Sequence, residues 1–233
     1  MLGIGISEDA AYVNALGALL IYIRRTQRSS LGHIVEVHQE TPSNYMSLDK
    51  STMRSLELIE PLYEADGNYS LVDILDKTKT SMGARLLRSW LKRPLKNLQN
   101  ITKRHDAIEK FMQHKEEIKP IRKALGNIYD FKRICGRIGA GRANARDLIS
   151  MKLSLMRIPE LKSLFTNVNK QGDKQSSALL NELYDRIDDF TDVSGLIENA
   201  LVDEPPITIT EGEIIKDGFD EEHCRWQGMD SGS

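Results

Sequence analysis

The segment spanning residues 81–92 carries the strongest structural signal in this sequence. Its apolar residues recur every three or four positions and form one wide stripe: Met82, Leu86, Leu87, Trp90 and Leu91. That interval is the period of an α-helix, so these side chains share one face. Ser81 can cap the start, and Arg93 precedes a proline, a position that disfavours helical backbone. The pattern predicts an amphipathic helix that ends near Arg93 and buries the face carrying Trp90.

The same periodicity recurs along most of the chain. It predicts helices over residues 7–27, 49–59, 97–112, 116–125, 130–138, 144–165 and 179–201, capped where Asp49, Asp130 and Asn144 stand. Within 144–165, Pro159 predicts a new turn or a kink. Aromatic residues make up only 6% of the chain, and β-branched residues rarely alternate with polar ones. The 233 residues, 40% of them hydrophobic, are enough to bury a core. We therefore predict an all-α fold, an irregular multi-helix bundle with at most short extended segments, at residues 33–38 and 207–210.

No pattern in the sequence specifies a catalytic site. The phosphate-binding pattern GxxxxGK[ST] is absent, and the glycines of residues 136–141 are predicted to end a helix. His33 and His38 have a spacing that metal-binding helices do not use. Residues 220–224 contain several possible metal ligands, but a solvated acidic end is the favoured interpretation. We predict no catalytic, cofactor-binding or metal-binding residues, and no enzyme activity for this chain.

Charge is distributed very unevenly along the sequence. Residues 76–142 contain 18 Lys and Arg against 6 Asp and Glu, whereas residues 173–233 contain 4 against 16. The basic block could neutralise nucleic-acid phosphates. Alternatively, its side chains are solvated helix faces, partly paired with the acidic segment. We favour the second interpretation, because the basic residues recur at helical spacing and only four aromatic residues, Trp90, Phe111, Tyr129 and Phe131, lie among them for bases to stack on.

The sequence is also typical of a cytoplasmic chain. The longest apolar run, residues 15–23, is far shorter than the roughly 20 residues that cross a bilayer. Cys135 and Cys224 have no paired spacing, which predicts two free thiols in a reducing compartment.

Several longer stretches resemble the MutS family of DNA mismatch repair proteins, in the family's order. The clearest are DILDKTKTSMGARLLRSWLKRPL at residues 73–95, GRANARDL at 141–148 and EPPITITEGEIIKDGFDEE at 204–222. We call the first two the signature segments. The resemblance extends from about Ala10 to Glu221. It departs from the family pattern at Glu213, where a second glycine is usual, and after Glu222.

The resemblance implies three parts. Residues 1–40 would be the end of the connector domain and a linking helix, residues 41–222 the helical core and lever domain, and residues 223–233 a tail that does not match the family. In the full-length protein this segment would couple ATP state to the grip on mismatched DNA. ATP and magnesium would bind that parent, in the bacterial cytosol or nucleoid. Its expected partners are mismatched double-stranded DNA, the other domains of the same chain and a second copy in a homodimer, with no membrane.

Two alternatives to this function stay open at this point. One is a stand-alone nucleic-acid-binding module that uses the basic block of residues 77–142, and the other is a helical protein-interaction domain. Phe219, Asp220 and Glu221 match the Phe-x-Glu spacing with which the family reads a mismatch. Their setting resembles the start of a lever helix, so that role is not transferred to them.

Overall fold

The computed structural model describes residues 13–26, 44–63, 69–169, 176–206, 212–216 and 218–219. These ranges contain eleven α-helices and no β-strand, only the isolated bridges between Tyr45 and Leu95 and between Leu201 and Ile215. The predicted all-α fold is confirmed. In chain order the helices are α1 Val13–Thr26, α2 Lys50–Ser55, α3 Leu71–Leu75, α4 Ser81–Lys92, α5 Leu98–Gln113, α6 Lys115–Gly126, α7 Phe131–Gly139, α8 Ala145–Leu155, α9 Ile158–Val168, α10 Ala178–Asp185 and α11 Thr191–Ala200.

Side-chain caps set the helix starts where the sequence predicts them. Asp49, Asp130 and Asn144 each accept a hydrogen bond from a backbone N–H in the first turn of the helix that follows. The cap of α4 is Thr80 rather than Ser81, because the Thr80 hydroxyl accepts from the N–H of Gly83 at 3.0 Å. The predicted cap was therefore wrong by one residue, and Ser81 is left free to bond elsewhere.

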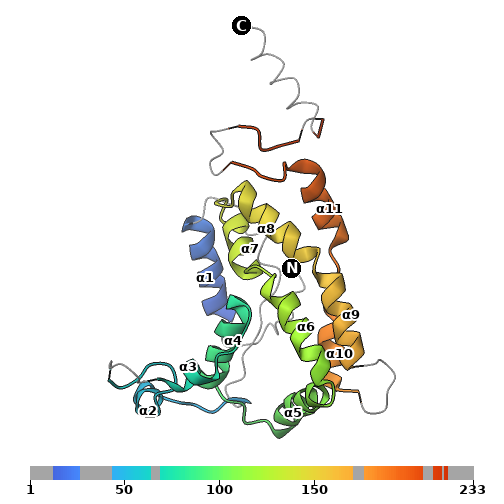
Figure 1. The fold of residues 1–233 in the computed structure, drawn as a ribbon. Coiled ribbons are helices and arrows are strands. Elements are labelled where there is room, and N and C mark those ends of the chain that lie inside the picture. Colours follow the sequence, from blue (N-terminus) through green and yellow to red (C-terminus); the bar gives the residue numbers. More distant parts are fainter. Residues whose placement is uncertain are drawn as a thin grey trace.

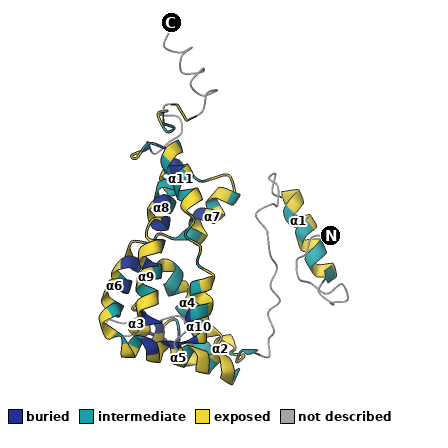
Figure 2. Ribbon diagram, turned by 90° about the vertical axis from the view of Figure 1, so that its right-hand side faces the viewer, coloured by how far each residue is buried: buried dark blue, intermediate teal, exposed yellow. Residues whose placement is uncertain are grey.

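The apolar side chains collect in two separate clusters. The lower cluster in Figure 1 joins α5, α6, α9 and α10, and its buried members are Ala107, Ile121, Ala124, Leu161, Val168 and Leu180. The upper cluster joins α8 to α11 through Ala145, Ile197 and Leu201. In Figure 2 the buried residues lie inside both groups of helices.

Two consecutive helices joined by a short turn, which we call the α8–α9 run, connect the two clusters. Helix α8 belongs to the upper cluster and α9 to the lower one, and only Met156 and Arg157 separate them. Both residues have right-handed helical backbone angles. The ladder of i→i−4 hydrogen bonds is interrupted at the junction. The N–H of Arg157 donates to the Ser154 carbonyl three residues back, Pro159 has no N–H, and the next bond runs from the N–H of Leu161 to the Arg157 carbonyl. Ser154 also accepts from the N–H of Tyr129 at 2.9 Å, which fixes the loop before α7 to this run.

The apolar stripe of α4 is not buried as predicted. None of its residues is buried, and the exposed fractions of Leu86 and Trp90 are 52% and 41%. Trp90 instead stacks against the Arg104 guanidinium, 3.7 Å from the ring centroid. The periodicity identified the helix and its apolar face correctly. It did not reveal that the described part of the chain leaves that face partly uncovered.

Two predicted helices are shorter or interrupted. Helix α2 ends at Ser55, not at residue 59, because Glu57 adopts a left-handed backbone with φ +48°. Residues 179–201 form two helices, α10 and α11. The break lies where the Asp188 carboxylate accepts from the N–H of Phe190, which has φ +46°. A short polar side chain that bonds to nearby backbone competes with helix formation, which explains this break.

Helix α1 has the predicted apolar stripe, but none of its residues is packed into a core. Val13, Leu16, Leu20 and Ile23 are partly covered, but α1 has no buried residue and stands apart from the other helices in Figure 2. Other predictions lie outside the described residues: the extended segments at 33–38 and 207–210, the acidic cluster at 220–224 and the tail at 223–233. The domain boundaries stay predictions.

Candidate functional site

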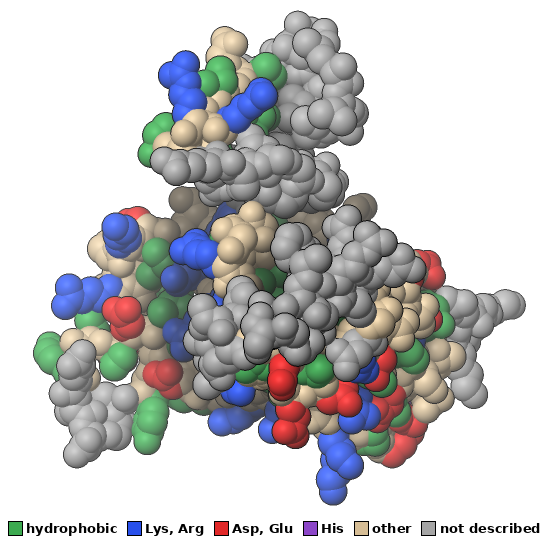
Figure 3. Space-filling model, turned by 90° about the horizontal axis from the view of Figure 1, so that it is seen from above, with side chains coloured by type: hydrophobic (Ala, Val, Ile, Leu, Met, Phe, Trp, Pro, Cys, Tyr) green, Lys and Arg blue, Asp and Glu red, His purple; other side chains and the backbone are tan. Residues whose placement is uncertain are grey.

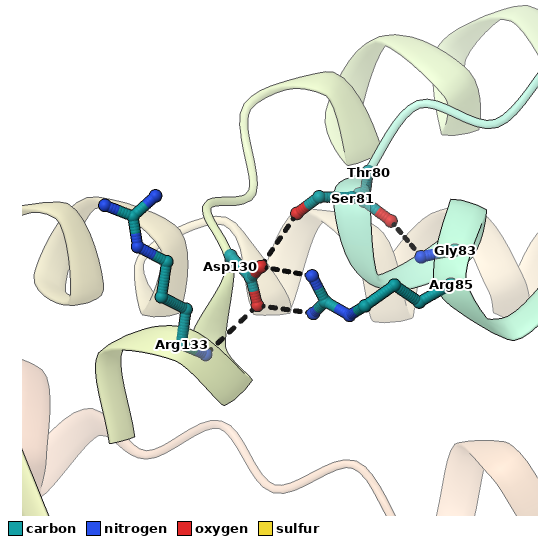
Figure 4. A network of polar contacts seen from close by, with 6 residues as sticks. All are labelled: Thr80, Ser81, Gly83, Arg85, Asp130 and Arg133. Carbon is teal, nitrogen blue, oxygen red and sulfur yellow. Dashed lines mark hydrogen bonds and ion pairs between the residues drawn. The ribbon is translucent and has the colours of Figure 1, made fainter. Parts of the chain in front are cut away.

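A carboxylate at the start of α7 joins the first signature segment to the rest of the domain. The two oxygens of Asp130 accept from the two terminal nitrogens of Arg85 at 2.6 and 2.7 Å (Figure 4). The Ser81 hydroxyl and the N–H of Arg133 donate to the same carboxylate at 3.0 and 3.1 Å. A single side chain therefore caps α7 and holds the first two turns of α4 against it. We call this arrangement the Asp130 junction.

The chemistry of the Asp130 junction stabilises the ionised carboxylate. The hydrogen bonds from the Arg85 guanidinium hold the pKa of Asp130 far below its usual range, and the same contact raises the pKa of Arg85. Paired, nearly parallel N–H···O bonds are the strongest form of this interaction and fix orientation as well as distance. The junction is suited to holding two helices in register, not to transferring protons near neutral pH.

Asp130→Asn tests this junction through pH. The asparagine still caps α7 but removes the charge, so the variant should melt at a lower temperature than the wild type at pH 7. A carboxyl whose folded pKa is depressed contributes stability above its unfolded pKa of about 4 and loses it as the pH falls through the folded value. The difference in Tm should therefore shrink below pH 4. Asp106→Asn, at an exposed position on α5, is the control. If the difference in Tm between the wild type and Asp130→Asn did not depend on pH, the stabilisation could not be assigned to the charge of Asp130.

A second polar junction lies between α8 and α11. Lys152 is only 5% exposed, and its Nζ lies 2.7 Å from a Glu198 oxygen and 3.4 Å from an Asp203 oxygen. The hydrogen bond that Lys152 donates to the Glu198 carboxylate raises the pKa of Lys152, and the one that it donates to Asp203 adds to the effect. Lys216 in turn donates to the Glu198 carbonyl at 2.7 Å. This Lys152 junction ties the end of α11, and the chain beyond it, to the upper cluster.

The second signature segment also serves as a connection. Asn144 and Asp147 cap α8 reciprocally at 2.9 Å, and Asp147 also accepts from the Arg137 guanidinium at 3.1 Å. Gly141 has φ +64°, a left-handed backbone that glycine adopts without strain, and the N–H of Arg142 bonds back to the Arg137 carbonyl. The glycine-rich stretch is thus confirmed as a helix terminator.

The departure from the family pattern at Glu213 has a structural counterpart. Glu213 adopts φ +50°, the left-handed region in which an L side chain is strained and glycine is not. The preceding Gly212 has φ +75°. A glycine at position 213 would therefore suit this backbone better than the glutamate found here.

Sequence reasoning missed both junctions as sites. Arg85 lies 45 residues from Asp130, and Lys152 lies 51 residues from Asp203, so only the fold brings them together. Within the described ranges no group of three or more His, Cys, Asp or Glu side chains could hold a metal ion. Cys135 is a free, exposed thiol. Phe219 is 44% exposed, and the two residues that follow it lie outside the described chain.

The charge asymmetry of the sequence is only partly visible on the surface. Figure 3 shows acidic side chains gathered toward the lower right of the face seen from above, with Lys and Arg spread over the rest. Lys152 and Lys162, both outside the basic block, pair with carboxylates of the acidic segment. No described helix combines the length and apolar character needed to traverse a bilayer.

Comparison with known proteins relates most of the chain to one family. The family described as MutS domain III matches residues 51–227. The chain is 41% identical over 217 residues to the DNA mismatch repair protein MutS of Lachnoclostridium phytofermentans, covering 93% of this chain and 22% of that protein. It is 42% identical over 220 residues to the protein of the same name from Acetivibrio thermocellus, covering 93% and 24%. The chain thus spans less than a quarter of the length of these curated relatives.

Proposed function

Because this chain belongs to the MutS domain III family, we propose that it is the helical core and lever segment of a DNA mismatch repair protein, coupling ATP state to the grip on mismatched DNA. In this proposal the chain itself catalyses nothing. ATP and magnesium bind elsewhere in a full-length cytoplasmic parent, which acts on mismatched double-stranded DNA and associates as a homodimer.

The observation that carries this proposal is the helical run from α8 to α9. It crosses from the upper to the lower cluster with only a two-residue turn between the helices, so a displacement of one cluster has a short path to the other. Packed cores shift between discrete arrangements and do not deform continuously, which suits a relay. The Lys152 junction holds this run at its α8 end by fixing α8 to α11, and the N–H of Tyr129, next to the Asp130 junction, donates to the Ser154 hydroxyl of α8.

A flexible joint in this run should uncouple the relay. We would replace the matching segment of the Lachnoclostridium phytofermentans MutS with this chain and introduce Met156→Gly with Arg157→Gly. Both side chains are more than half exposed, so little packing is lost, while each glycine in a helix costs about 1 kcal/mol and frees the backbone. The chimera should still bind a mismatched duplex and hydrolyse ATP, but ATP should no longer change its lifetime on that duplex.

The matched control for the joint is Thr102→Gly with Lys103→Gly, two adjacent exposed positions within α5. This variant carries the same two glycines without touching the α8–α9 junction, and it should respond to ATP as the unmodified chimera does. Equal loss of the ATP response in both variants would indicate general destabilisation. An intact response in the Met156 and Arg157 variant would contradict the relay.

The isolated chain tests one of the two open alternatives, a nucleic-acid-binding module. Fluorescence anisotropy with matched and mismatched duplexes over a salt series should show no preference for the mismatch. Tight, mismatch-selective binding would contradict the proposal. Binding to both duplexes that weakens linearly with the logarithm of salt concentration would support the module based on residues 77–142.

A further inference from the structure

Helix α6 borders an open groove that neither polar junction uses. The groove has a volume of about 700 Å³ and lies between α6, the end of α5 and the loop before α4. Five basic side chains line it, namely Lys79, Lys115, Lys119, Arg122 and Lys123. Met112, Ile118 and Gly126 provide an apolar floor. We call this feature the α6 groove.

The helix divides its two faces between core and groove. Ile121 and Ala124 are 5% and 2% exposed and pack in the lower cluster with α9. Lys115, Lys119 and Arg122 follow one another at intervals of four and three residues, which aligns them on the opposite face. The basic stripe is therefore held on a helix whose other side is anchored in the core.

The cations of the α6 groove are not neutralised by their neighbours. Among the described residues, no carboxylate lies within ion-pair distance of any of the five. The two acids of α6 are engaged elsewhere: Glu116 faces the His114 imidazole, and Glu117 accepts from Asn167 of α9. Within the described part of the chain, the groove therefore presents unpaired positive charge beside exposed apolar surface.

We propose that the α6 groove binds an acidic amphipathic helix of a partner protein. Its apolar residues would lie on Met112 and Ile118, and flanking carboxylates would meet the basic stripe. Charge complementarity selects an acidic partner, and the apolar floor selects a protein over a nucleic acid. Phosphates offer nothing to cover that floor, and no aromatic side chain lines the groove for base stacking. The 12 residues of α6 span about 18 Å, matching a helix of three to four turns.

The test uses the full 233-residue chain and a fluorescein-labelled 16-residue peptide. The peptide carries leucine at positions i, i+3, i+4 and i+7 and glutamate beside them, and a scrambled peptide has the same composition without an apolar face. Anisotropy should show that the amphipathic peptide binds and that the scrambled one binds at least about tenfold more weakly.

Lys119→Glu with Arg122→Glu should weaken binding of the amphipathic peptide by about tenfold or more. Lys103→Glu with Lys132→Glu, the same charge change at exposed positions outside the groove, should leave it within about twofold.

Melting curves followed by circular dichroism check that each variant is folded. A charge-swapped peptide, with lysine in place of each glutamate, should bind the Lys119→Glu, Arg122→Glu variant more tightly than it binds the wild-type chain. Equal binding of the scrambled peptide would overturn the proposal, because charge alone would then suffice. So would stronger binding of duplex DNA than of the peptide, or a dimer of this chain that only the groove variant dissociates. This outcome is independent of the ATP response of the chimera, so either proposal can fail alone.

Discussion

Replacing Leu161 with alanine should lower the free energy of unfolding by about 2 to 5 kcal/mol. Leu161 lies on α9 and is 6% exposed within the lower cluster, where α5, α6, α9 and α10 meet. The neighbouring Phe111 and Phe165 pack edge to face with their ring centroids 6.0 Å apart, so the surroundings cannot collapse freely into the cavity. Urea denaturation followed by circular dichroism measures the change.

Leu86→Ala is the matched control, since it deletes the same atoms at a residue that is 52% exposed. We expect its cost to stay below about 1 kcal/mol. The order of the two values decides whether the principal core lies at α9 or along the α4 stripe. A larger loss of unfolding free energy in Leu86→Ala than in Leu161→Ala would contradict the structure. It would indicate that the α4 stripe is buried, as the periodicity of the sequence predicts.

Lys152→Glu should be the most damaging single charge change in the upper half of the domain. It places a third carboxylate at a 5% exposed position beside Glu198 and Asp203, where the cation now stands. Breaking such a pair by removing one partner commonly costs roughly 3 to 5 kcal/mol, and mutual repulsion adds to the loss. The free energy of unfolding at pH 7 should fall by at least roughly 3 kcal/mol.

Two further measurements separate charge from packing at Lys152. Lys152→Met keeps the apolar stem, and the exposed carboxylates of Glu198 and Asp203 can return to water, so its cost should be smaller. Burial beside two carboxylates raises the pKa of the introduced carboxyl in the folded state. Lowering the pH toward 4 should therefore reduce the difference in unfolding free energy between the glutamate variant and the wild type. Equal deficits in both variants at every pH would assign the effect to packing alone.

Much of the secondary structure was predictable because its causes are local. The caps at Asp49, Asp130 and Asn144 depend on a side chain reaching backbone within its own first turn, and a pattern of residues records that directly. The end of α7 follows from the freedom of Gly141 to take φ +64°. Errors appeared where a local competitor interrupted a periodic pattern, as at Glu57 and between Asp188 and Phe190.

The sequence by itself determined the all-α class, the helix starts at Asp49, Asp130 and Asn144, and the family, because caps, periodicity and ordered motifs lie within short stretches of chain. Only the tertiary structure decided which faces are covered and which distant charges meet. It left the Trp90 face half exposed, joined Arg85 to Asp130 and Lys152 to Glu198, and left the cations around α6 without carboxylates in the described chain. Burial and ion pairing depend on what packs opposite a residue, and residues 45 or more positions apart carry no local record of that pairing.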